Sequence, residues 1–247
     1  MLLATEVRDC LYLNWALAPA ALPPLPEGLG LDLQVEDGVT HAFVSLLCFR
    51  QANLATGGLT LPGLTFPQAN LRLYVRDAEG VPSVYFVRML LPIWMVPAAR
   101  GLARQPASPA VFDFPARVGV AGEWTWRVET GGAEARVTAH PGAPACARAP
   151  RFGGWERAVE FFRHRPRGYA RLGGRLRRSE TVPPAAESTP LVARVLRSTW
   201  LERLLPGVGA EVWGAPHSAF LCPRLPLELE VETWRRPALA VEVPQPG

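Results

Sequence analysis

The 247-residue sequence contains no lysine, and arginine therefore supplies all 26 of its basic side chains. This absence excludes a Schiff-base lysine, a phosphate-loop lysine and every other site that depends on a lysine amine. Isoleucine occurs once, at Ile93, and asparagine three times, whereas alanine, glycine, proline and leucine are abundant. This usage is typical of a GC-rich genome, so the compositional bias does not by itself indicate an activity.

Cysteine and histidine are also scarce and scattered. The four cysteines, at positions 10, 48, 146 and 222, form no Cys-x-x-Cys pair, and none of the four histidines stands at metal-ligand spacing. This pattern argues against a zinc site and against a disulfide framework. We therefore expect neither a metal nor a cofactor.

The sequence has no apolar run long enough for a membrane-spanning helix. The longest run, residues 89–99, is about half of the roughly 20 residues that such a helix requires. The first ten residues carry Glu6, Arg8 and Asp9 and lack the apolar core of a signal peptide. We expect a cytoplasmic protein that does not associate with membranes.

Positive charge is confined to one part of the chain. The formal net charge is +4 and the isoelectric point is near 9.2, but residues 151–180 alone hold nine arginines against three glutamates. The rest of the chain is slightly acidic, so no broad basic surface is predicted. We therefore expect no nucleic-acid partner.

The remaining composition, 49% hydrophobic and 19% charged, is that of a globular protein. Alternating or β-rich segments bounded by glycine and proline predict a mainly β (α+β) fold. The predicted strands are residues 7–15, 30–36, 39–49, 70–77, 81–90, 111–119, 122–129, 133–139, 167–172, 175–181 and, in pieces, 210–235. Helices are predicted over residues 154–164 and 199–205. Neither Ala- and Pro-rich stretch, 139–150 or 182–190, separates self-sufficient regions, so we expect one domain over residues 1–247.

A predicted hairpin gathers the side chains that could form a site. A four-residue turn at residues 77–80 would place Arg76 opposite Val81, Tyr74 opposite Ser83 and Arg72 opposite Tyr85. One face then collects Asn70, Arg72, Tyr74, Arg76, Ser83 and Tyr85. The other face collects Leu71, Leu73, Val75, Val84 and Phe86, which indicates the core.

A second hairpin is predicted at Gly173-Gly174. The two glycines allow the positive φ angles of a two-residue turn. This turn would pair Tyr169 with Arg178 and Arg167 with Glu180.

Several segments resemble one known family, the YqjF-like proteins or domain of unknown function 2071. They are Arg8-Asp9-Cys10-Leu11-Tyr12-Leu13-Asn14-Trp15, Pro24-Leu25-Pro26-Glu27-Gly28-Leu29, Phe43-Val44-Ser45-Leu46, Pro67-Gln68-Ala69-Asn70-Leu71-Arg72-Leu73-Tyr74-Val75-Arg76, Gly168-Tyr169-Ala170-Arg171, Gly173-Gly174-Arg175-Leu176 and Pro183-Pro184. The matches follow one another in order over most of the chain, and residues 90–150 fit less well.

That family is similar to the acetoacetate decarboxylase superfamily, and the resemblance implies an antiparallel, partly closed barrel or cone with a few peripheral helices. In those decarboxylases, a lysine pair after a Trp-Gly-x-Pro run forms the Schiff base. The similar run here is Trp94-Met95-Val96-Pro97-Ala98-Ala99-Arg100, with alanines in place of the lysines. Since the chain has no lysine anywhere, we expect no imine chemistry.

The predicted ligand-binding residues are Asn70, Arg72, Tyr74, Arg76 and Tyr85. Guanidinium groups bind carboxylates in a fork and tyrosine hydroxyls complete the orientation, so a small organic anion such as a carboxylate would suit a barrel pocket with this face. The other interpretation of the face is a solvated one, with Arg76 paired to Asp77 or Glu79. No catalytic residue is assigned.

Two further functions are left open by the sequence. One is a lyase or hydratase that uses Arg72, Tyr74 and an acid not yet placed, and the other is a non-catalytic interaction protein. A homo-oligomer is compatible with either.

Overall fold

The computed structural model describes residues 2–36, 38–56, 59–101, 104–119, 121–142, 152, 154–181 and 187–233. The strands are β1 (Leu2–Leu17), β2 (Leu29–Leu31), β3 (Gln34–Glu36), β4 (Val39–Thr56), β5 (Leu59–Asp77), β6 (Pro82–Leu91), β7 (Ala107–Pro109), β8 (Val111–Asp113), β9 (Trp124–Thr130), β10 (Ala133–Pro141), β11 (Arg167–Leu172), β12 (Arg175–Thr181), β13 (Thr189–Arg197) and β14 (Ser218–Thr233). The helices are η1 (Pro19–Ala21), η2 (Ile93–Met95), α1 (Val96–Gly101), α2 (Trp155–Arg163), α3 (Thr199–Leu204) and α4 (Ala210–Gly214). The prediction of a mainly β fold is confirmed.

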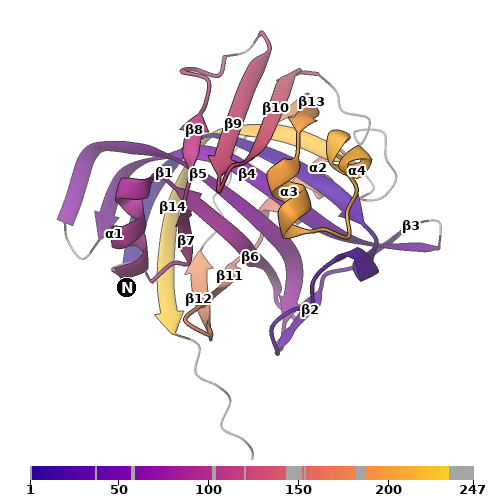
Figure 1. The fold of residues 1–247 in the computed structure, drawn as a ribbon. Coiled ribbons are helices and arrows are strands. Elements are labelled where there is room, and N and C mark those ends of the chain that lie inside the picture. Colours follow the sequence, from indigo (N-terminus) through magenta and orange to yellow (C-terminus); the bar gives the residue numbers. More distant parts are fainter. Residues whose placement is uncertain are drawn as a thin grey trace, which may run out of the picture.

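The strands form one large sheet in the order β1-β4-β5-β6-β11-β12-β14-β13-β10-β9-β8 (Figure 1). Most neighbours are antiparallel, as expected, but β6 pairs in parallel with both β7 and β11, so the sheet is mixed. In addition, β1 pairs with β14, so the two ends of the segment β1-β4-β5-β6-β11-β12-β14 are hydrogen-bonded to each other. Among the described strands β8 pairs only with β9, and the sheet as a whole is not closed into a barrel.

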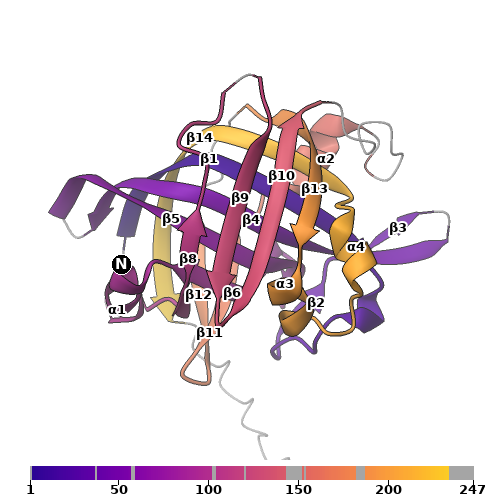
Figure 2. The same cartoon turned by 45° about the horizontal axis from the view of Figure 1, so that its top comes forward.

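The central strands β1, β4 and β5 carry apolar side chains on both faces because both faces are covered. One face packs against β9, β10, β13, α3 and α4, with Trp15, Leu46 and Leu73 in that cluster. Figure 2 shows β8, β9, β10 and β13 lying in front of these central strands. The other face packs against α2, the helix predicted over residues 154–164, through Ala158, Val159 and Phe162.

Two segments near the carboxyl end differ from the prediction. Residues 210–214 form helix α4 rather than part of a strand, and β13 was not predicted at all. Strand β13 alternates correctly toward the core at Leu191 and Val195, but its outward residues Val192 and Leu196 are apolar and exposed. This outward apolar pair hides the period of two that identifies a half-buried strand.

The hairpin of β11 and β12 agrees with its prediction. Gly173 and Gly174 have φ angles of 57° and 75°, a region that residues with a Cβ seldom adopt. The register pairs Tyr169 with Arg178 and Arg167 with Glu180.

The turn between β5 and β6 is built around the Asp77 carboxylate. It accepts hydrogen bonds from the Val81 amide (2.9 Å), the Arg167 guanidinium (2.7 Å) and the Tyr169 hydroxyl (2.9 Å). Burial alone would raise the pKa of Asp77, but these hydrogen bonds and the charge of Arg167 outweigh it and hold the pKa below its usual value. The turn is therefore tied to β11 by an ionised group.

We expect the stability that Asp77 contributes to depend on pH. Because the pKa is lowered in the folded state, the contribution is fully present above the unfolded carboxyl pKa of about 4 and is lost as the pH falls through the folded value. The melting temperature of the wild type should therefore fall more steeply below about pH 4 than that of Asp77→Asn. Parallel pH dependences for the two proteins would contradict this role.

Candidate functional site

The hairpin of β5 and β6 has a different register from the predicted one, and this moves Tyr85. Arg76 pairs with Pro82 rather than Val81, so Val81 joins the turn and Arg72 lies opposite Phe86. Tyr85 instead pairs with Leu73 and packs against the cluster on the opposite face. The prediction that Tyr85 shares a face with Arg72 is wrong, because a shift of one residue turns every side chain of a strand to the other face.

Arg72 and Tyr74 lie together on the face of β5 that α2 covers. Arg72 is 8% exposed, and its Nη2 donates to the main-chain carbonyl of Phe162 at 2.7 Å and to the Tyr74 hydroxyl at 3.2 Å. Its Nε atom is buried and has no hydrogen-bond partner among the described residues. The guanidinium also lies over the rings of Tyr12 (5.2 Å) and Tyr74 (5.4 Å).

The charge of Arg72 has no carboxylate partner within the described part of the chain. Burial alone would lower the pKa of Arg72, but Tyr74 and Tyr12 outweigh it and keep that pKa above its ordinary value, so the group stays charged. Burial raises the pKa of Tyr12 well above its usual value, so this tyrosine is neutral. Arg72 is therefore a buried cation whose hydrogen-bond partners in the described part of the chain are a main-chain carbonyl and a tyrosine hydroxyl.

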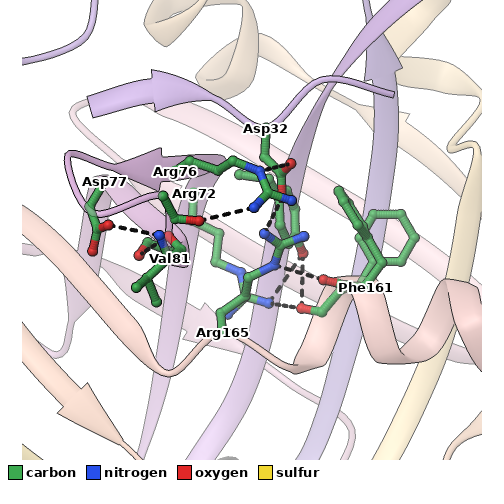
Figure 3. A network of polar contacts seen from close by, with 11 residues as sticks. Asp32, Arg72, Arg76, Asp77, Val81, Phe161 and Arg165 are labelled. Carbon is green, nitrogen blue, oxygen red and sulfur yellow. Dashed lines mark hydrogen bonds and ion pairs between the residues drawn. The ribbon is translucent and has the colours of Figure 1, made fainter. Parts of the chain in front are cut away.

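Arg165 is equally buried but is compensated. It is 4% exposed, forms an ion pair of 2.5 Å with Asp32 and donates through Nε to the carbonyl of Phe161 at 2.8 Å. Asp32 also accepts from Arg76 at 2.9 Å, and Arg76 is half exposed. Figure 3 shows Arg76 and Arg165 reaching Asp32 beside the end of α2. Arg76 thus pairs with Asp32, not with Asp77 or Glu79 as the solvated alternative supposed.

Asn70 lies farther along the same face of β5. It is buried and accepts a hydrogen bond from Gln68 at 2.9 Å. Of the five predicted site residues, the structure therefore brings Arg72 and Tyr74 into contact, places Arg76 at the exposed side next to Asp32, and leaves Asn70 with Gln68.

A row of buried polar side chains that was not predicted from the sequence continues from Tyr74 across three neighbouring strands. The Tyr74 hydroxyl lies 2.6 Å from Ser45 on β4, Ser45 bonds to Asn14 on β1, and Asn14 donates to Ser218 on β14 at 3.0 Å. All four side chains are essentially inaccessible to water. Single polar residues inside the apolar runs Leu11–Leu17 and Phe43–Leu47 are the signal that could have found Asn14 and Ser45.

The cysteines and the alanines of the decarboxylase-like run do not add chemistry to this site. Burial raises the pKa of the Cys10 and Cys222 thiols, which keeps both protonated. Ala98 and Ala99 lie on α1, and Ala99 packs in a separate small cluster with Phe66. The described residues contain no group of three or more His, Cys, Asp or Glu that could hold a metal ion. None of the helices in the described ranges is long and apolar enough to span a membrane.

The structure defines a mainly β protein that buries two arginines, Arg72 and Arg165, beside helix α2, in a chain that has no lysine. The chain belongs to the family of uncharacterised conserved proteins called domain of unknown function 2071, whose model matches residues 4–204. Among proteins of curated function, none matches the sequence significantly.

Solved structures with the same fold are distant in sequence. The enduracididine biosynthesis enzyme MppR with HEPES buffer bound has a TM-score of 0.60 at 13% identity, covering 94% of this chain and 87% of that one. The same enzyme complexed with pyruvate has a TM-score of 0.58 at 12% identity, covering 94% and 90%. An acetoacetate decarboxylase-like enzyme from Sphingomonas wittichii RW1 has a TM-score of 0.58 at 11% identity, covering 92% and 90%.

Proposed function

We propose that this protein binds a small organic anion, a carboxylate, at Arg72 between β5 and α2. The observation that carries the proposal is the contrast between two buried arginines, because Arg165 has Asp32 as its counterion, whereas the described residues give Arg72 a main-chain carbonyl and a tyrosine hydroxyl but no carboxylate. An isolated buried charge is costly, so a chain gains from giving it an anionic partner.

The partners that Arg72 has in the free protein are substitutes for an anion. The carbonyl of Phe162 belongs to the last turn of α2, where unpaired carbonyls carry partial negative charge. The rings of Tyr12 and Tyr74 present their electron-rich faces to the same cation. A carboxylate would bind more strongly than any of these, because charge-assisted hydrogen bonds are roughly twice as strong as neutral ones.

The surroundings add attraction for an anion. Arg72, Arg76 and Arg165 contribute three positive charges around Tyr74 and Asp32, and Asp32 contributes the one negative charge of that group. The field of such a cluster favours an anionic ligand. One solved structure of this fold is complexed with pyruvate, itself a small carboxylate.

Titration calorimetry with a series of small mono- and dicarboxylates tests the proposal. We expect saturable binding that weakens as the salt concentration rises, since the contact is ionic. Amides of the same acids should not bind. If the amides bind as tightly as the acids, the proposal fails.

Catalysis is not part of the proposal. A lyase or hydratase needs a general base within reach of the bound anion, and around Arg72 the pKa of Tyr12, Cys10 and Cys222 is raised by burial. We further infer that the chain acts as one domain, since strands from Leu2 to Thr233 share one sheet.

We expect no imine to form with acetoacetate, because no side-chain amine exists in the chain. Treatment with acetoacetate and borohydride should leave the protein mass unchanged, apart from reaction at the α-amino terminus. Peptide mapping by mass spectrometry checks the result. A reduced adduct on an internal residue would contradict it.

A further inference from the structure

The donors and acceptors along the buried polar row follow one direction, which is set by the side-chain amide of Asn14. The Nδ2 atom of Asn14 lies 3.0 Å from Oγ and 3.5 Å from the main-chain carbonyl of Ser218. A carbonyl only accepts, so the amide nitrogen must face Ser218 and the amide oxygen must face Ser45. The single hydroxyl proton of Ser45 is therefore donated to Asn14.

This direction requires the hydroxyl proton of Tyr74 to be donated to Ser45. Ser45 has no second proton to give, so the 2.6 Å bond between the two hydroxyls requires Tyr74 to be the donor. Donation from Tyr74 to the Phe162 carbonyl, 3.3 Å away, would leave two oxygens 2.6 Å apart with no proton between them. The Tyr74 oxygen thus presents a lone pair, not a proton, on its side toward Arg72.

Two acceptors therefore depend on one nitrogen of Arg72. Nη2 serves both the Tyr74 oxygen and the Phe162 carbonyl, while Nε has no hydrogen-bond partner in the ranges that the structure describes. A carboxylate that binds an arginine side-on uses Nε together with Nη2. It therefore takes the donor away from at least one of these buried acceptors, which must find another donor or remain unsatisfied.

We infer that the ligand of this site is a hydroxy acid, whose carboxylate binds Arg72 and whose hydroxyl donates to the oxygen of Tyr74 or Phe162. This inference rests on the proposed function and adds the substrate class. An oxo acid of the same skeleton brings a second acceptor to this position and repels the lone pairs already there. Asn14 and Ser45 touch no ligand, and they act as positioning residues by holding the Tyr74 proton away from it.

The experiment compares matched acids of equal carbon skeleton by calorimetry, namely lactate with pyruvate, malate with oxaloacetate, and 2-hydroxyglutarate with 2-oxoglutarate. For whichever pair binds, we expect the hydroxy acid to bind the wild type about tenfold or more tightly than the oxo acid. In Ser45→Ala the Tyr74 proton is released and can donate to the oxo group. The ratio of the two affinities should then fall to about threefold or less.

Two further variants keep the test decisive. Ser83→Ala removes another fully buried serine hydroxyl, which bonds to the Val81 carbonyl on the other face of the hairpin, and it should leave the ratio unchanged. Tyr74→Phe should lower the ratio even if Ser45→Ala does not fold. Equal or tighter binding of the oxo acids by the wild type overturns the inference and leaves carboxylate binding intact. Absence of binding by every acid overturns the proposed function itself.

Discussion

Replacement of Asp32 by asparagine is expected to lower the free energy of unfolding by about 3–5 kcal/mol. The change keeps the shape of the side chain but removes the charge that compensates Arg165, which is 4% exposed. Burial already lowers the pKa of Arg165 against the effect of this ion pair, yet the guanidinium stays protonated at neutral pH. Arg76, being half exposed, can turn to water, whereas Arg165 cannot. Urea denaturation measures the loss.

A matched control is an ion pair near the surface. The side chains of Arg127 and Glu129 are 34% and 40% exposed. Glu129→Gln should therefore change the free energy of unfolding by no more than about 0.5 kcal/mol. A loss below about 1 kcal/mol for Asp32→Asn would mean that Arg165 reaches water and that its burial is not structural.

Replacement of Arg72 by methionine is expected to have a small effect on stability and a large effect on carboxylate binding. No carboxylate is orphaned among the described residues, so the free energy of unfolding should stay within about 2 kcal/mol of the wild type, with lost hydrogen bonds to Phe162 and Tyr74 offset by removal of a buried charge. Affinity for the carboxylate should fall by about 100-fold or more, because the ligand loses the cation with which it forms its ion pair.

Two results would contradict this second prediction in different ways. A loss of about 3–5 kcal/mol in Arg72→Met would assign the arginine a structural role like that of Arg165. Unchanged stability together with unchanged carboxylate binding would place the ligand elsewhere. Arg165→Met serves as the comparison, since among the described residues it leaves the buried Asp32 with the half-exposed Arg76 as its one ion-pair partner, and it should be the less stable variant.

The parts of the site that were predictable from sequence depend on local geometry. The period of two along β5 correctly placed Arg72 and Tyr74 on one face and Leu73 on the other. The Gly173-Gly174 pair likewise fixed the register of its hairpin, because a two-residue turn with positive φ leaves one pairing.

The position of Tyr85 was not predictable by the same means. Strand β6 is apolar on both faces, with Val84 and Phe86 in one cluster and Tyr85 and Val87 in the other. A register error of one residue therefore produced no conflict in the hydrophobic pattern. The register is decided by the inclusion of Val81 in the turn. The main-chain N–H of Val81 donates a hydrogen bond to the Asp77 carboxylate, and a contact between a side chain and the main chain does not show in the hydrophobic pattern.

The sequence by itself determined what chemistry is excluded and which side chains alternate. Without lysine the chain has no side-chain amine for imine chemistry, and Arg72 and Tyr74 must share a face of their strand. Only the tertiary structure decided which buried arginine is compensated. Asp32 lies far from both arginines in the sequence, and the fold brings it to Arg165 and Arg76. Charge compensation depends on distances between strands that sequence spacing does not contain, so the sequence predicted Arg72 as a ligand-binding residue but could not predict that Asp32 would pair with Arg165 and not with Arg72.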